Sequence, residues 1–158
     1  MKIIDNELLD NLAREAAASG RKRKNLNFHD DYADPCQRLL NAVEPGSYIR
    51  PHRHLSPPKP ETFLIVRGRM AVFIFGDGGD VERCVPLSPS GKTIGVDVPP
   101  GAWHSIVSLE SGAVFFETKP GPFEPIPEQD RAPWAPPEGT PEAAQYLRRL
   151  EEAVKCER

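Results

Sequence analysis

The sequence has 158 residues, of which 39% are hydrophobic and 27% charged, and its formal net charge is −3. This length and composition predict one globular domain with a sizeable core and exclude a disordered chain. The mildly acidic balance argues against general nucleic-acid binding, and no apolar run has the roughly 18–20 residues that span a bilayer. The first residues lack a signal-peptide pattern and the three cysteines are widely spaced, so we expect a cytoplasmic protein with reduced thiols.

Residues 5–18 are predicted to form a helix that Asp5 or Asn6 caps and Gly20 ends. Its buried stripe is formed by leucines at helical spacing: Leu8, Leu9 and Leu12. With the polar connector that follows, this helix makes up residues 1–34.

The connector contains the basic run 21–24 (RKRK) and the isolated His29. We interpret the basic run as a solvated helix end or an anion contact. A single histidine in a loop is usually a surface residue, although a connector of this length could also border a pocket.

Residues 35–119 have the pattern of about eight or nine short strands, with hairpin chemistry at 76–80 (GDGGD). Such spacing is typical of an antiparallel barrel or sandwich. The runs 62–66 (TFLIV) and 70–75 (MAVFIF) are apolar on both faces, so we expect each to be covered on both sides. The second cover would be another sheet or another subunit, which favours a homodimer.

Residues 120–158 are predicted to form a proline-rich arm and a closing helix. The stretch 120–141 holds eight prolines, which exclude a regular helix or a central strand there. Thr140 can cap the helix that follows. Its predicted buried stripe consists of four apolar side chains: Ala144, Leu147, Leu150 and Val154.

Three of the four histidines fall in two short segments, 52–54 (HRH) and 99–104 (PPGAWH). In an extended chain, residues two apart point to the same side, so His52 and His54 would aim two imidazoles at one point. Imidazole and carboxylate groups are common ligands of Zn, Fe, Ni and Mn, and Glu61 and His104 lie within reach along the chain. The sequence therefore predicts a metal site inside a small β-barrel.

The order Gly46, His52, His54, Glu61, Gly68 resembles the first motif of the cupin superfamily, and PPGAWH resembles the second. The resemblance implies an all-β fold, a double-stranded β-helix (jelly-roll) barrel with short N-terminal and C-terminal helices. It also implies one divalent metal ion held by His52, His54, Glu61 and His104, with the identity of the metal left open. Two features depart from the pattern: six residues separate His54 from Glu61, and Ser108 stands where an asparagine is usual.

A closer resemblance covers most of the chain. The runs QRLLNAVEPGSYIRPHRH, PPK, PPGAWH, FETKPGP and APWAP are similar to the WbuC family of cupin-fold metalloproteins. Members of that family are associated with gene clusters for bacterial surface polysaccharide (O-antigen) synthesis and have no firmly assigned reaction. The resemblance implies a link to polysaccharide biosynthesis without naming a reaction.

If the strand before the histidines runs regularly, Tyr48 and Arg50 share the inward face with them, and we take both as candidate catalytic residues. Arg50 would favour a carboxylate-bearing ligand, or it would pair with a carboxylate such as Glu117. Tyr48 would act as a proton donor or as a hydrogen-bond partner. The predicted apolar walls of the pocket are Phe63, Ile65 and Phe116, with Trp103 packed at the barrel rim.

Three functions remain open from the sequence. A Lewis-acidic metal could support isomerisation or epimerisation of a small polar, carbohydrate-related metabolite. An Fe(II) centre could support a dioxygenase-type oxidation. A metal-dependent module could also bind a sugar or small acid without turnover, so the sequence does not establish that the protein is an enzyme.

Overall fold

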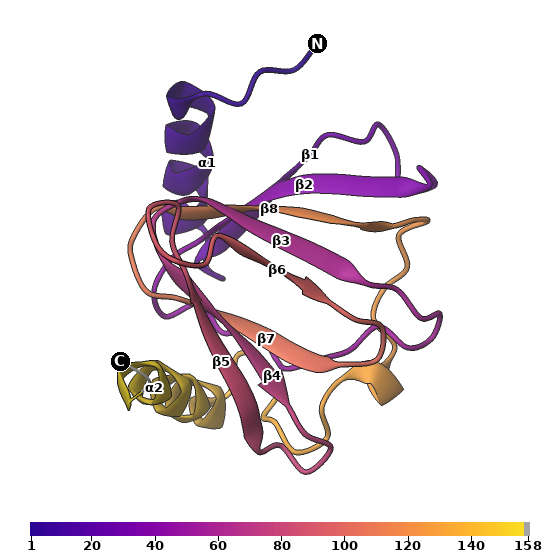
Figure 1. Ribbon diagram of the computed structural model, residues 1–158, viewed down its shortest axis with the longest axis vertical. Helices are drawn as coiled ribbons and strands as arrows, with labels where there is room; N and C mark the ends of the chain where they lie inside the picture. Colours follow the sequence, from indigo (N-terminus) through magenta and orange to yellow (C-terminus); the bar gives the residue numbers. More distant parts are fainter. Residues whose placement is uncertain (157–158) are drawn as a thin grey trace.

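The computed structural model describes residues 1–156 and the side chains of residues 1–154, and within them it places eight strands, two α-helices and one short 3₁₀ helix (Figure 1). The strands are β1 (Arg23–Asn27), β2 (Cys36–Val43), β3 (Glu61–Arg67), β4 (Met70–Phe75), β5 (Val81–Leu87), β6 (Gly95–Val98), β7 (Trp103–Ser108) and β8 (Ala113–Pro120). The helices are α1 (Asn6–Ala18), α2 (Pro141–Cys156) and the 3₁₀ helix η1 (Glu128–Asp130).

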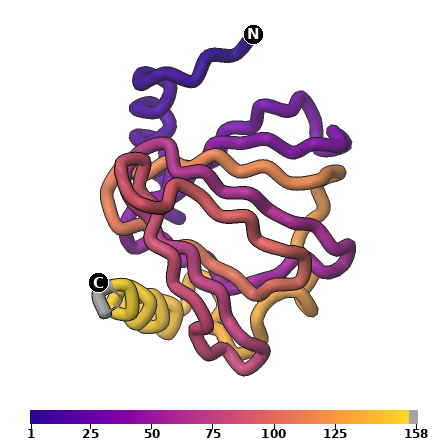
Figure 2. Tube along the Cα trace, viewed as in Figure 1, coloured from indigo at the N-terminus to yellow at the C-terminus, as the bar shows by residue number. Residues whose placement is uncertain are grey.

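The strands form two antiparallel sheets that face each other. The larger has the order β1-β2-β8-β3-β6 and the smaller the order β5-β4-β7. Strands distant in sequence pair over their whole length, as where Cys36–Val43 of β2 runs against Ala113–Pro120 of β8. This arrangement confirms the predicted all-β jelly-roll barrel with a helix near each end of the chain (Figures 1 and 2).

Side-chain alternation along the strands fills the space between the sheets. In β3, Phe63 and Ile65 point inward and are buried, whereas Leu64 and Val66 point outward and are exposed. The interior cluster also takes apolar residues from the facing sheet: Met70, Val72 and Ile106. One end of the interior is therefore an apolar core, and the polar site lies toward the other end.

The two helices cover opposite outer faces of the barrel. Leu9, Leu12 and Ala16 of α1 pack on the outer face of β2 and β8, with Leu40 and Val114. On the smaller sheet, α2 and the preceding arm cover β4 and β7 through an apolar cluster that includes Phe73, Phe75, Val107, Leu147 and Leu150. The chain's own arm and helix thus cover the second apolar face of 70–75, so that run needs no second subunit.

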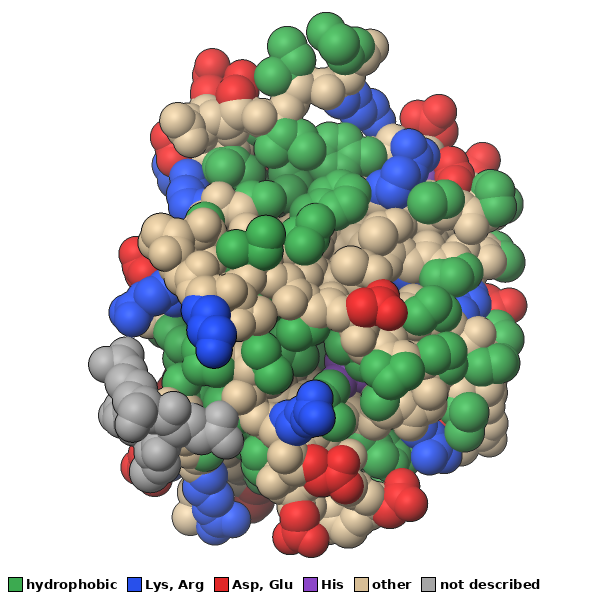
Figure 3. Space-filling model, viewed as in Figure 1, with side chains coloured by type: hydrophobic (Ala, Val, Ile, Leu, Met, Phe, Trp, Pro, Cys, Tyr) green, Lys and Arg blue, Asp and Glu red, His purple; other side chains and the backbone are tan. Residues whose placement is uncertain are grey.

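The outer face of β3 and β6 is different, because no element covers it in the described part of the chain. Leu64, Val66 and Ile94 are exposed there. Figure 3 shows hydrophobic side chains gathered on this side of the molecule.

The N-terminal region contains a strand that the sequence did not suggest. Asp5 caps α1 as predicted, accepting a hydrogen bond from the backbone N–H of Leu8, and the helix ends at Ala18. Part of the predicted connector is β1, which pairs in register with β2 from Arg23↔Val43 to Asn27↔Leu39. Because β1 turns polar side chains toward the barrel interior, it lacks the apolar alternation by which a strand is usually found.

The segment 47–54, predicted as a strand, is extended but forms only isolated bridges, at His52 with His104 and with Arg131. Beyond β8, the proline-rich arm contains the short helix η1 and otherwise irregular chain, as its prolines require. Thr140 accepts a hydrogen bond from the Ala143 backbone and caps α2. The buried stripe of α2 begins at Ala143, not at Ala144, which is exposed.

Neither helix in residues 1–156 combines the length and the apolar character needed to cross a membrane. Cys36 is exposed and Cys84 is buried, and the side chain of Cys156 lies outside the described residues.

Candidate metal centre

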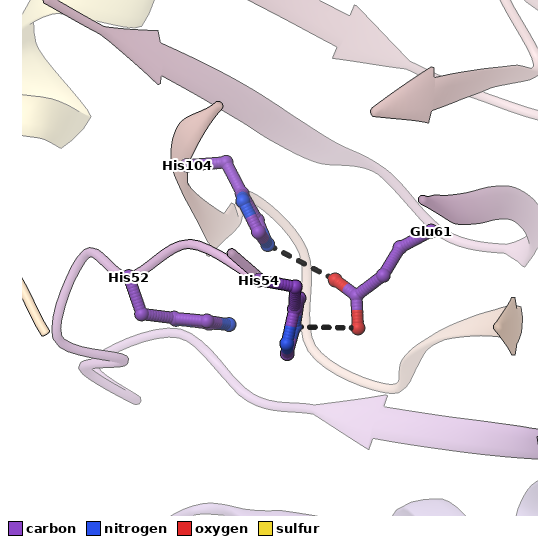
Figure 4. Close-up of side chains that lie close together, drawn as sticks. All are labelled: His52, His54, Glu61 and His104. Carbon is purple, nitrogen blue, oxygen red and sulfur yellow. Dashed lines mark hydrogen bonds and ion pairs between the residues drawn. The ribbon is translucent and has the colours of Figure 1, made fainter. Parts of the chain in front are cut away.

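Four side chains converge at one end of the barrel interior (Figure 4). Ligand-type atoms of His52, His54, Glu61 and His104 all lie within 4.8 Å of one another. Glu61 is the first residue of β3 and His104 the second of β7, so the two sheets contribute one residue each. The backbone of His52 exchanges hydrogen bonds with that of His104, at 3.0 and 2.8 Å, and this ties the histidine segment to β7. The long loop before Glu61 therefore does not remove this carboxylate from the cluster.

The proline-rich arm holds the histidine segment in place. Asp130, of which 1% is exposed, accepts hydrogen bonds from the backbone N–H groups of Leu55 and Ser56 at 3.3 and 3.0 Å, and from Arg53 at 3.2 Å. Its backbone carbonyl accepts from the Arg53 N–H at 2.9 Å. The arm thus positions the chain on both sides of His54.

The imidazoles present the groups that a metal ion requires. The Nδ1 atoms of His52 and His104 lie 3.1 and 2.9 Å from the carbonyls of Arg50 and Ala102, respectively. An N–H donated to a carbonyl fixes the tautomer and leaves Nε2 with a lone pair directed at the cluster. Nε2 of His54 is buried 2.9 Å from a Glu61 oxygen but makes no hydrogen bond. Lone pairs that face a carboxylate need a cation between them, so these residues fit a divalent metal ion.

The electrostatics keep this donor set in its metal-binding form. Burial alone would raise the pKa of the Glu61 carboxyl, but its contacts with His104 and His54 and the nearby Lys119 charge hold that pKa well below its usual range. Burial and the neighbouring His104 lower the pKa of His52 well below its usual value. Glu61 is therefore ionised and His52 neutral near pH 7, as a metal site requires.

Lys119 joins the cluster to a second carboxylate. Its ammonium group lies 2.5 Å from Glu61 and 2.7 Å from Glu117. Burial opposes the charge on Lys119, but the two carboxylates raise its pKa, so it stays protonated. Burial raises the pKa of Glu117, which also accepts a hydrogen bond from Asn41 at 2.8 Å.

A cavity of about 450 Å³ lies beside the cluster, and His52, Glu61 and His104 are in its wall. Its apolar side includes Phe63 and Phe115. Three residues of the basic run also line it: Arg21, Arg23 and Lys24. The run thus borders the candidate site, although Arg21 and Arg23 also pair with Glu138 and Lys24 with Glu15.

The structure contradicts the predicted placement of Tyr48 and Arg50. Tyr48 is buried in the apolar cluster under α2, and its hydroxyl donates to the Pro136 carbonyl at 2.9 Å. Arg50 donates to the Ala132 carbonyl and pairs with Glu128 of the arm, not with Glu117. Ile49 lines the cavity together with His52, which shows that the inward and outward alternation of side chains shifts by one residue between them. Neither candidate catalytic side chain faces the metal ligands.

The predicted walls are partly right. Phe63 lines the cavity and Ile65 is in the inner core, but Phe116 packs on the outer face near Phe28, and Phe115 takes the inner position. Trp103 is buried in the apolar cluster between the smaller sheet and the arm with α2, and the Arg53 guanidinium lies 4.2 Å from its ring centre.

Sequence reasoning missed Lys119 as a member of the site and treated Glu117 only as a partner for Arg50. The available signal was their spacing: residues two apart on a strand share a face, and Glu117 and Lys119 follow the inward-facing Phe115.

The sequence matches the family described as "Domain of unknown function (DUF6016)" over residues 4–87, which is more than half of the chain. The chain belongs to this family. The matched region includes His52, His54 and Glu61 of this DUF6016 protein, but not His104. No curated protein matches the sequence significantly.

Solved structures similar to this DUF6016 protein include cupins. TT1209 from Thermus thermophilus has 22% identity and a TM-score of 0.53, and the match covers 76% of this chain and 97% of that one. A cupin 2 domain-containing protein from Halorhodospira halophila has 19% identity and a TM-score of 0.50, with coverage of 84% and 81%. An oxalate oxidase has 16% identity and a TM-score of 0.50; the match covers 66% of this chain but only 56% of the oxidase. At these identities the likeness establishes the cupin fold alone.

Proposed function

We propose that this protein is a metal-dependent cupin that acts on a small polar, carbohydrate-related metabolite. The observation that carries the proposal is the convergence of three imidazoles and one carboxylate, with ligand atoms within 4.8 Å, at the wall of a cavity of about 450 Å³. Ligand cavities in proteins are commonly about 300–1,000 Å³, large enough for a sugar-sized molecule. The resemblance to the WbuC family supports a link to surface-polysaccharide biosynthesis.

In this proposal His52, His54, Glu61 and His104 hold the ion, which when bound supplies Lewis acidity toward an oxygen of the ligand. Glu117 lines the same cavity outside the ligand set and is the carboxylate available to accept a proton. Lys119 and Asn41 fix the orientation of that carboxylate. These roles are those of a sugar isomerase or epimerase.

The metal assignment is tested by elemental analysis of protein purified without chelators or a histidine tag. We expect about one divalent ion per chain in the wild type and loss of stoichiometric metal in His52→Ala and His104→Ala. His29→Asn is the matched control, because it alters the one histidine outside the cluster and is expected to retain the metal. Full occupancy in both alanine variants would refute the assignment.

The reaction is tested by following sugars in deuterated water by NMR. Metal-loaded wild type is expected to exchange the proton on the carbon next to the carbonyl, whereas Glu117→Gln is expected to bind the sugar without exchange. Saccharide binding with no exchange in the wild type would instead indicate a binding module. Bound iron with consumption of oxygen would indicate the dioxygenase-type reaction.

We also propose that the protein is a cytoplasmic homodimer that uses the outer face of β3 and β6. The exposed Leu64, Val66 and Ile94 support the dimer, because contiguous apolar side chains on a sheet face favour association.

A further inference from the structure

A second cavity, of about 290 Å³, adjoins the cavity of the metal centre. The two share four lining residues: Asn25, Asn41, Glu117 and Lys119. The second cavity continues from these residues away from the metal cluster to His29, and Tyr32 and Phe123 line it too. A molecule bound at the metal centre can therefore extend past Glu117 into this space.

Polar side chains on the inner face of the larger sheet line this region. Asn25 of β1 pairs across the ladder with Asn41 of β2, and both face the cavities. In Figure 1, β1 and β2 lie on the side of this sheet farthest from the smaller sheet. Because no sheet faces this surface, the exposed Asn25 and the half-buried Asn41 remain accessible to a polar ligand.

His29 is the clearest sign of a missing partner. Only 5% of this residue is exposed. Its Nδ1 lies 3.1 Å from both the backbone nitrogen and the carbonyl oxygen of Arg38, so the backbone of Arg38 satisfies Nδ1 in either tautomer. The other ring nitrogen, Nε2, is buried and has no hydrogen-bond partner among the described residues. A buried polar atom without a hydrogen-bond partner costs about 1–3 kcal/mol, so a partner from outside the chain is expected.

The amides nearby also have unused capacity. Asn25 donates to Asn27 at 2.8 Å and Asn41 donates to Glu117 at 2.8 Å. Within residues 1–156, no hydrogen bond engages the side-chain oxygens of Asn25 and Asn41. Tyr32 and Phe123, with ring centres 4.9 Å apart, add an aromatic surface at the outer side. Neutral donors and acceptors beside an aromatic surface suit hydroxyl groups on a carbon chain or ring. Among the described residues that line the second cavity, Lys119 is the one lysine or arginine that could bind an anionic group.

We propose that this second cavity is a subsite for the polyhydroxylated part of the ligand, with His29 and Asn41 as hydrogen-bonding residues. The inference rests on the proposed function, because the other end of the ligand lies at the metal cluster. It narrows the ligand class to a hydroxyl-rich molecule long enough to extend from the metal cluster past Glu117, and it makes a small unsubstituted acid a poor ligand.

The test compares six-carbon acids that can chelate a metal in the same way but differ in their remaining hydroxyls. Binding of gluconate, mannonate, galactonate and 2-hydroxyhexanoate to metal-loaded protein is measured by isothermal titration calorimetry. At least one hexonate is expected to bind ten or more times tighter than 2-hydroxyhexanoate. Affinities that are equal for all four acids, or no saturable binding of any, would overturn the inference.

The variants locate the effect. His29→Asn keeps an acceptor for the Arg38 N–H near the position of Nδ1 and removes Nε2, while Asn41→Ala removes one amide. Each variant is expected to lower the affinity for the preferred hexonate by about 3–10-fold, which is the contribution of one hydrogen bond. The affinity for 2-hydroxyhexanoate is expected to stay unchanged. Gln145→Ala, on the exposed face of α2, is the control and should change neither.

The inference would be overturned if both variants lost affinity for the hexonate and for 2-hydroxyhexanoate alike. It would also be overturned if neither variant lost affinity for either acid. Metal content is measured in every sample. A wild type without metal refutes the proposed function itself, whereas a metal-loaded protein that does not discriminate between the acids refutes only the subsite.

Discussion

Lys119 connects the stability of the barrel to its metal. The ammonium group contacts Glu61 at 2.5 Å and Glu117 at 2.7 Å, and its side chain is only 18% exposed. Without a metal ion it is the cation that both carboxylates share. Removing one partner of a buried ion pair costs about 3–5 kcal/mol, so we expect Lys119→Met to destabilise the metal-free protein by that amount. For a chain of this size, that lowers Tm by roughly 6–20 °C.

A bound divalent ion should offset much of this loss. The ion supplies positive charge to Glu61, and Glu117 keeps its hydrogen bond from Asn41. We therefore expect the metal-loaded variant to lose no more than about half as much stability as the metal-free variant. If Lys119→Met costs about 2 kcal/mol less stability with metal than without it, linkage requires the variant to bind metal roughly 30-fold more tightly than the wild type does.

Calorimetric unfolding with and without metal, and chelator competition for affinity, measure these quantities. Arg69→Met is the control, since its pair with Glu110 is half exposed and should contribute less than about 1 kcal/mol in both states. Equal loss of stability in the metal-free and metal-loaded Lys119→Met protein would refute the argument, because Lys119 and the ion would then not neutralise the same carboxylate.

Three further predictions concern the ligands and the exposed face. Glu61→Gln removes the only carboxylate of the cluster, so metal affinity by chelator competition should fall on the order of 100-fold; unchanged affinity would place Glu61 outside the coordination sphere. Because the pKa of His52 is lowered on folding, the unfolded chain takes up that proton first, and the metal-free protein should lose stability as pH falls below about 6.5. In urea titrations, His52→Asn should reduce the change in unfolding free energy with pH. An unchanged pH dependence would contradict the assignment of this loss of stability to His52. Leu64→Asp should convert a dimer to a monomer in light scattering, and a monomeric wild type would exclude this interface.

The sequence was sufficient to predict the barrel and the clustering of the four candidate ligands because both are marked by short-range patterns. Alternating apolar residues and the hairpin at 76–80 marked the strands, and the paired histidines and PPGAWH, through their resemblance to the cupin motifs, marked the candidate ligands. The long SPPKP loop (56–60) makes the spacing between His54 and Glu61 longer than in the cupin motif, so the sequence alone does not place the carboxylate of Glu61. The structure places its carboxylate 3.0 Å from His104, since the loop folds outside the barrel and β3 begins at Glu61 itself.

The face on which Tyr48 and Arg50 lie could not be predicted in the same way. A regular strand places residues two apart on one side, and that rule fails when the backbone is irregular. The chain from 47 to 51 forms no ladder, and the arm bonds to it at Pro51 through the Ala132 N–H, at 2.9 Å. This contact arises from residues about eighty positions apart, which no local pattern records.

The polar part of the site was missed for a related reason. Sequence methods find strands by the apolar face they bury, whereas β1 turns Asn25 toward a cavity and was interpreted as a connector. The same polarity that concealed this strand is what gives the cavity its hydrogen-bonding groups. If the second cavity were an unused gap, apolar residues on β1 and β2 could close it and stabilise the barrel. The buried Nε2 of His29, which has no hydrogen-bond partner among the described residues, lies beside two amides, and this favours a site where stability has been given up for binding.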